Sequence, residues 1–169
     1  MFYYSDVLLQ HVPKEWVWYR IYHTFPISVC LSFDRGANST AQVAARIRQF
    51  HGKYTLLLTA APTFIEKTQV LPGCRFVVGA DTAARLIMEK YYGGTRQGLH
   101  AAFAAVAAAD CRFVVAGRAD DTTGQFVNFD RAKECASVGV DPELFLTLTE
   151  AEFRMDISSS ALRAKGRGL

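Results

Sequence analysis

The chain has 169 residues, carries 19 basic and 16 acidic side chains, and has a formal net charge of +3. This length suits a single domain that buries about 70 per cent of its unfolded surface without help from a metal or a disulfide. The mild charge argues against DNA or RNA as the main partner, and no apolar run approaches the roughly 20 residues of a membrane helix. We therefore expect a cytoplasmic protein with no nucleic-acid or membrane partner.

The cysteines are four in number and widely spaced: Cys30, Cys74, Cys111 and Cys135. Three of them lie in or beside apolar runs that are typical of core strands and helices. Spacing of this kind fits neither a disulfide framework nor a zinc site. We expect buried free thiols in a reducing compartment.

The first 26 residues differ in composition from the rest of the chain. Residues 1 to 25 hold eight of the 21 aromatic residues and show no clean periodicity. We therefore divide the chain into an atypical aromatic-rich segment, residues 1 to 26, and an α/β domain, residues 27 to 169.

In the second part, short apolar runs alternate with helical patterns. The runs that predict strands are residues 27 to 33, 54 to 59, 75 to 78, 112 to 116 and 144 to 148. Helices are expected at 40 to 50, 65 to 70, 82 to 90, 95 to 109 and 130 to 135, and residues 124 to 130 suit a short strand or a loop. This alternation predicts a Rossmann-like parallel sheet with helices on both faces.

Polar residues and glycines follow two of these predicted strands. Gly79 and Asp81 come after the run at 75 to 78, and Gly117 and Arg118 come after the run at 112 to 116. Open α/β sheets bind ligands at the carboxyl ends of their strands. Gly79 would let a ligand approach the backbone, Asp81 would accept hydrogen bonds from ribose, and Arg118 would hold a phosphate. The alternatives are a plain glycine turn, an Asp81 cap on the next helix, and an arginine that pairs locally in an acidic loop.

Three serines, Ser158, Ser159 and Ser160, precede a helical pattern near the carboxyl terminus, and Arg163 lies one turn inside that helix. The amino end of such a helix offers free backbone N–H groups and a positive dipole end, which together bind phosphate. Capping of the helix by a serine is the structural alternative.

The segment ISSSALR, residues 157 to 163, resembles the Ile-Ser-Ser-Thr-x-Ile-Arg element of the nucleotidylyltransferase superfamily. FVVGADTAARL (76 to 86) and FVVAGR (113 to 118) resemble elements of the same family, in the family's order. The resemblance, which spans roughly residues 27 to 168, is strongest to a cytidylyltransferase-like branch described as nicotinamide mononucleotide adenylyltransferase-like. Ser160 and Leu162 replace the family's threonine and isoleucine, which keeps a hydroxyl and an apolar contact.

This resemblance implies a mononucleotide phosphate that attacks the α-phosphorus of a nucleoside triphosphate such as ATP, with release of pyrophosphate. It assigns the triphosphate to the three serines and Arg163, the nucleoside to Gly79 and Asp81, and a small phosphorylated second substrate to Arg118. Catalysis in such a site comes from alignment and charge neutralisation, with Mg²⁺ carried by the substrate.

The sequence departs from the family at its beginning, because no His-x-Gly-His motif is present. The family's first strand is likewise missing or replaced, which would expose an apolar sheet edge that residues 1 to 25 or a second subunit must cover. We consider three alternatives: an enzyme whose amino-terminal motif lies outside this chain, a non-catalytic nucleotide-binding sensor or interaction module, and a scaffold whose aromatic segment replaces the first strand or mediates self-association into a homo-oligomer.

Overall fold

The structure is a computed structural model that describes residues 2–4, 28–32, 40–50, 52, 55–120 and 123–154. Across these ranges the chain is an α/β protein in which helices connect strands that pair in parallel. The predicted class is confirmed at this level, because buried β-branched and aromatic runs alternate with helical segments as the sequence indicates.

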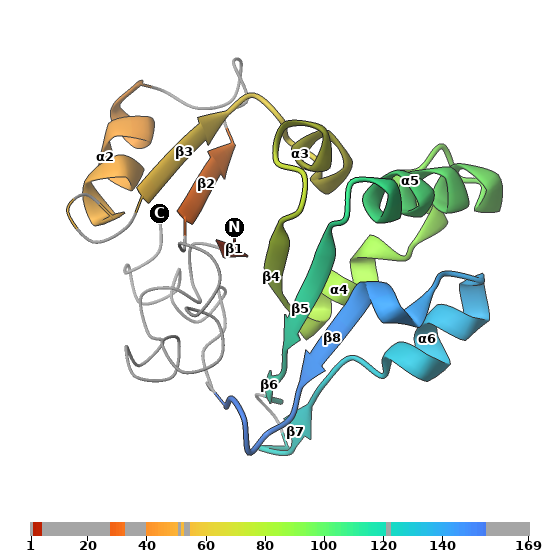
Figure 1. The fold of residues 1–169 in the computed structure, drawn as a ribbon. Coiled ribbons are helices and arrows are strands. Elements are labelled where there is room, and N and C mark those ends of the chain that lie inside the picture. The colour runs from red at the N-terminus through yellow and green to blue at the C-terminus, as the bar shows by residue number, and fades with distance from the viewer. Residues whose placement is uncertain are drawn as a thin grey trace.

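A four-stranded parallel sheet forms the centre of the described chain (Figure 1). Its strands, in spatial order, are β1 (Phe2–Tyr4), β4 (Arg75–Gly79), β5 (Arg112–Ala116) and β8 (Phe145–Leu148). Gly79 lies opposite Ala116, and Ala116 lies opposite Leu148, so three strands end at the same level. A strand from the aromatic-rich segment, β1, covers the edge of β4.

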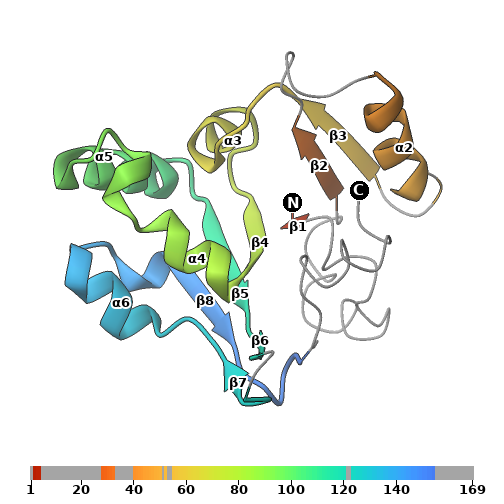
Figure 2. The same ribbon diagram turned by 180° about the vertical axis from the view of Figure 1, so that it is seen from behind.

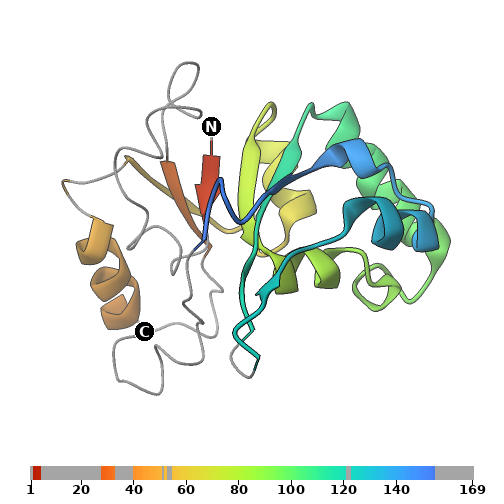
Figure 3. The ribbon, with the colours of Figure 1, turned by 90° about the horizontal axis from the view of Figure 1, so that it is seen from below.

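A second pair of parallel strands, β2 (Ser28–Ser32) and β3 (Thr55–Thr59), is connected through α2 (Thr40–Phe50). β2 lies beside β1 (Figure 3), but the two are not joined in one hydrogen-bonded ladder. In Figure 1 the arrows of β2 and β3 point the opposite way from those of β4, β5 and β8. The carboxyl ends of the two groups of strands therefore lie at different edges of the molecule.

The helices that pack on the four-stranded sheet contribute to one core on one of its faces (Figure 2). They are α3 (Phe64–Val70), α4 (Ala80–Leu86), α5 (Arg96–Ala108) and α6 (Arg131–Val138), with 3-10 turns η1 (Glu89–Tyr91) and η2 (Pro142–Leu144) between them. In the core, Phe113 stacks on Phe145 with ring centroids 5.2 Å apart, and Phe103 packs against both rings. Each such buried side chain contributes about 1.5–3 kcal/mol of transfer free energy.

The prediction of one helix over residues 82 to 90 is wrong in its extent, because α4 ends at Leu86 and a separate turn, η1, follows. The Tyr92 hydroxyl donates a hydrogen bond of 2.6 Å to the Leu86 carbonyl, which therefore has a partner without a further helical turn. Met88 adopts an extended conformation between the two pieces. A side-chain hydrogen bond within the segment thus outweighs its helical propensity.

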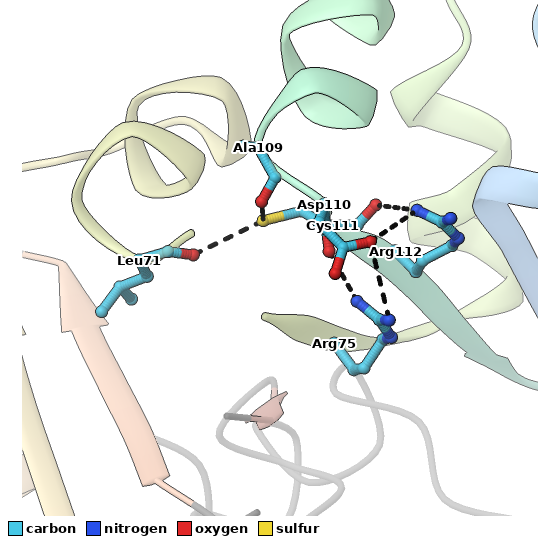
Figure 4. A network of polar contacts seen from close by, with 6 residues as sticks. All are labelled: Leu71, Arg75, Ala109, Asp110, Cys111 and Arg112. Atoms are coloured by element: carbon cyan, nitrogen blue, oxygen red, sulfur yellow. Dashed lines mark hydrogen bonds and ion pairs between the residues drawn. The ribbon is translucent and has the colours of Figure 1, made fainter. Parts of the chain in front are cut away.

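The turn between α5 and β5 is organised by Asp110, which adopts a left-handed conformation with φ 51° (Figure 4). Arg75 Nη1 donates to the Asp110 carbonyl at 2.6 Å, and Arg112 Nη1 lies 3.5 Å from its carboxylate. The buried Cys111 thiol donates to the Leu71 carbonyl at 3.4 Å, and burial raises the pKa of this thiol. These contacts connect the amino ends of β4 and β5.

Cys74, Cys111 and Cys135 are free and buried, which confirms the predicted free thiols at these positions; the side chain of Cys30 lies outside the described residues. None of the helices in the described ranges has the length and apolarity that a membrane crossing requires.

Candidate functional site

Three of the predicted site residues come together where β4 and β5 end. Gly79 is the last residue of β4, Asp81 lies in the first turn of α4, and Arg118 lies two residues beyond β5. Arg118 donates from Nε and from Nη2 to Asp81 Oδ2, at 3.3 Å and 3.2 Å. We call Gly79, Asp81 and Arg118 the strand-end cluster.

A short hairpin holds Arg118 in this position. β6 (Arg118–Ala119) pairs antiparallel with β7 (Phe126–Val127); a short strand was one of the two alternatives for residues 124 to 130, but this pairing was not predicted. Arg118 Nη1 also donates to the Ala119 carbonyl at 3.0 Å. The guanidinium group is therefore oriented by backbone as well as by Asp81.

The hairpin approaches β5 closely at Gly117. A Cβ atom at this position would lie 2.4 Å from Phe126 Cζ and 2.7 Å from the Val127 carbonyl oxygen. Only a residue without a side chain fits between the end of β5 and β7. Gly117 thus allows β7 to pack against the end of β5, and this packing fixes the position of the neighbouring Arg118.

Asp81 does not cap α4, contrary to one of the two roles considered for it. The N-cap residue is Gly79, which makes no side-chain cap hydrogen bond, and Asp81 lies inside the helix with its carboxylate directed at Arg118. The alternative that Arg118 pairs only within its own loop is also wrong, because its partner Asp81 belongs to another element.

The Asp81–Arg118 ion pair is open to solvent, since the two side chains are 69% and 31% exposed. Exposed pairs of this kind contribute about 0–1 kcal/mol to stability. Asp81 Oδ2 accepts both guanidinium hydrogen bonds, and within the described part of the chain Oδ1 has no hydrogen-bond partner. The cluster therefore offers an acceptor oxygen beside an oriented cation.

Backbone is accessible at Gly79. Among the described residues, its chain neighbours aside, no atom lies within 4 Å of the position that a Cβ would occupy there, and φ is −77°, so the conformation itself does not require glycine. A molecule can therefore contact the main chain at the end of β4 from this side.

Asn128, which is not among the residues predicted for the site, connects the third strand, β8, to the same edge. Its Nδ2 donates to the Leu148 carbonyl at the end of β8, at 2.5 Å, and its Oδ1 accepts from the Phe129 N–H at 2.8 Å. An asparagine between two apolar residues was the available signal, because such a side chain needs hydrogen-bond partners when it is partly buried.

The remaining predicted site residues, Ser158, Ser159, Ser160 and Arg163, lie outside the described residues, as does the helix expected to carry them. The described chain ends at Arg154, whose Nη2 donates to the Gly124 carbonyl in the β6–β7 loop at 3.4 Å. The chain therefore leaves the described region beside the hairpin that positions Arg118.

Among the residues that the structure describes, no three His, Cys, Asp or Glu side chains are grouped so that they could hold a metal ion.

In comparisons with known proteins, no family model, curated protein or solved structure matched this chain. The structure itself shows an α/β fold with parallel strands. The geometry of the strand-end cluster is the basis for a proposal about function.

Proposed function

We propose that this chain binds a nucleoside triphosphate at the carboxyl ends of β4 and β5 and transfers its nucleotidyl group to a small phosphorylated substrate. The observation that carries the proposal is the convergence of Gly79, Asp81 and Arg118 from separate elements onto one sheet edge. This is the edge at which open parallel α/β sheets bind ligands. A Rossmann-like arrangement of the whole nucleotidylyltransferase-like domain is part of the same proposal.

Each member of the cluster has a role that its surroundings support. Asp81 Oδ1 accepts a ribose hydroxyl, while Oδ2 keeps Arg118 in place. Arg118 donates to a phosphate of the second substrate, and its orientation before binding reduces the entropy lost on binding. Gly79 allows the nucleoside to contact backbone, because no atom of the described residues beyond its chain neighbours fills the space beside it.

The reaction needs no protein nucleophile. A phosphate oxygen of the acceptor forms a bond to the α-phosphorus, the bond from that phosphorus to the β-phosphate oxygen breaks, and pyrophosphate leaves. A Mg²⁺ ion that arrives with the triphosphate would neutralise part of the phosphate charge, and we assign it no protein ligand. Ser158, Ser159, Ser160 and Arg163 are proposed to hold the triphosphate.

A second candidate function is a nucleotide-binding module without turnover. The sequence favours it in one respect, since the chain contains no His-x-Gly-His motif to stabilise charge on the transferred phosphates. Loss of a single preorganised donor of that kind typically slows catalysis by roughly 100- to 1000-fold.

Calorimetric titration with ATP, CTP and nicotinamide mononucleotide, followed by a pyrophosphate-release assay, distinguishes the two candidates. Binding with pyrophosphate release supports the transferase, and binding without release supports the module. Absence of binding to any of the three compounds contradicts both.

The triphosphate assignment has its own test. Arg163→Ala is expected to weaken triphosphate binding by about 1.5–3 kcal/mol, the range for a hydrogen bond to a charged group, with little change in stability. Equal affinity in the variant removes Arg163 from the site.

A further inference from the structure

A cleft of about 260 Å³ lies between α3, α4 and the segment that follows α4. α3 and α4 lie on the helix-covered side of the sheet (Figure 2). The residues of the cleft used below are Phe64, Ile65, Arg85, Leu86, Tyr91 and Tyr92. Neither Gly79 nor Arg118 lines it, so the cleft is separate from the strand-end cluster.

The walls of the cleft are largely apolar and include a fixed aromatic surface. The Phe64 ring packs edge-on against Phe76 and Phe113, with centroids 5.5 Å away in both cases. Tyr91, which also lines the cleft, is 56% exposed, and Lys90 Nζ lies over its ring at 5.0 Å from the centroid. Aromatic walls of this kind favour a flat, apolar guest.

Most polar groups of the lining are already engaged in hydrogen bonds. The Tyr92 hydroxyl donates to the Leu86 carbonyl, and burial raises its pKa to about 12, so it remains protonated at neutral pH. The Thr63 hydroxyl takes part in the capping box of α3, where it accepts from Glu66 N–H and donates to the Glu66 carboxylate. These groups are not available to a ligand.

Arg85 keeps unused hydrogen-bonding capacity. Its Nε donates to the Asp81 carbonyl at 3.1 Å, and its Nη2 donates to Thr82 Oγ1 at 3.3 Å, so both contacts lie within α4. Within the described part of the chain, Nη1 has no hydrogen-bond partner. Arg85 lines the cleft, and its guanidinium group therefore keeps N–H donors that match a carboxylate.

We propose that this cleft binds a small aromatic carboxylate, whose ring lies against Phe64 and Tyr91 and whose carboxylate accepts hydrogen bonds from Arg85. The volume suits one or two fused rings. Arg85 is the charged residue of the lining, and Lys67 Nζ and Lys90 Nζ lie 5.0 Å from the Phe64 and Tyr91 ring centroids, so the cleft favours a ligand with an acidic group. The proposal is independent of the nucleotide site.

The test is an NMR titration of the whole chain with 2-naphthoate, compared with the neutral 2-naphthalenemethanol and with acetate. We expect saturable shifts centred on residues 63 to 65, 82 to 86 and 91 to 92 with naphthoate, and at least tenfold weaker binding of the alcohol and of acetate, as expected when about 1.4 kcal/mol or more is lost. Equal binding of the alcohol would overturn the role of Arg85. Shifts elsewhere, or none at millimolar concentration, would overturn the site.

Two variants complete the experiment. Arg85→Gln should weaken naphthoate binding about tenfold or more, whereas Lys133→Gln, which removes the same charge from an exposed position on α6, should leave it unchanged. Naphthoate binding is read from shifts at the cleft and nucleotide binding by calorimetry, so failure of this site is distinguishable from failure of the nucleotide site. Equal weakening by Arg85→Gln and Lys133→Gln would reduce the effect to net charge and contradict the proposal.

Discussion

At the scale of single residues, the two strand-end glycines have different physical roles although they occupy similar places in the sequence. Gly79 has open space where a side chain would project, whereas Gly117 is in contact with the β6–β7 hairpin. Both glycines come after a run of the pattern Arg-Phe-Val-Val, so the sequence alone does not distinguish their surroundings. The difference comes from Phe126 and Val127, which pack against Gly117 only after the chain has turned back.

Gly117→Ala is therefore expected to destabilise the protein by about 1–3 kcal/mol, the usual cost of forcing atoms into a packed site. The introduced methyl group would approach a backbone oxygen at 2.7 Å, and that oxygen cannot rotate away. Urea unfolding followed by circular dichroism measures the change, with Gly79→Ala as the matched control. Equal midpoints for the two variants would contradict the packing role.

Tyr92 gives the protein a dependence on pH in the alkaline range. Burial raises its pKa in the folded state to about 12, above the usual value of about 10, so the folded protein keeps the phenolic proton longer than the unfolded chain does. Stability from this group is fully present below about pH 10 and is lost as the pH rises toward 12.

The comparison of wild type with Tyr92→Phe tests this effect. The variant loses the hydrogen bond to the Leu86 carbonyl, so below pH 10 it should be less stable by about 1 kcal/mol. Above pH 10 this difference should shrink, because only the wild type has the phenol that titrates. A difference that stays constant from pH 8 to pH 12, within the range where unfolding is reversible, would show that Tyr92 does not titrate as described.

At the scale of elements, strands were predictable where they are buried on both sides, as in β4 and β5, because continuous β-branched runs have few other uses. Elements set by specific side-chain contacts were not. The end of α4 depends on a hydrogen bond from Tyr92, and the pairing of β6 with β7 depends on the close approach at Gly117. The same is true of the candidate site. Its position at the strand ends was predictable from the sequence, whereas the pairing of Asp81 with Arg118 was not.

Helix α5 shows a local signal that the structure confirms. Thr95 was expected to begin this helix, and its side chain accepts a hydrogen bond from the Gly98 N–H at 3.1 Å. Leu99, Phe103 and Val106 face the core from this helix and are buried. The capping residue thus fixes where a central packing element starts.

Thr95→Ala should lower the free energy of unfolding by about 1 kcal/mol, because an N-cap hydrogen bond is lost. Thr95→Ser keeps the hydroxyl and should retain most of the wild-type stability. Thermal unfolding of the three proteins provides the comparison, and a serine variant as unstable as the alanine variant would assign the effect to the lost methyl group instead of the cap.

At the scale of the whole molecule, the direction of the strands decides where a ligand site can form. β4, β5 and β8 end together, whereas β2 and β3 point the opposite way, so three strand ends and the β6–β7 hairpin gather at one edge (Figure 1). The sequence predicted parallel strands but not this division, because strand order and direction depend on contacts between distant segments. The strand-end cluster follows from the division, and the proposed function rests on that cluster.

The most direct test of the central claim is a calorimetric titration in which a phosphorylated acceptor is added to the protein in the presence of a nucleoside triphosphate. The titration compares wild type, Arg118→Gln and Lys133→Gln. Arg118 lies in the strand-end cluster and Lys133 on the exposed side of α6, so the two variants remove the same charge at different places. We predict about tenfold or greater loss of acceptor affinity for Arg118→Gln and none for Lys133→Gln. Equal affinities in all three proteins, or no binding by the wild type, would contradict a nucleotide site at the ends of β4 and β5.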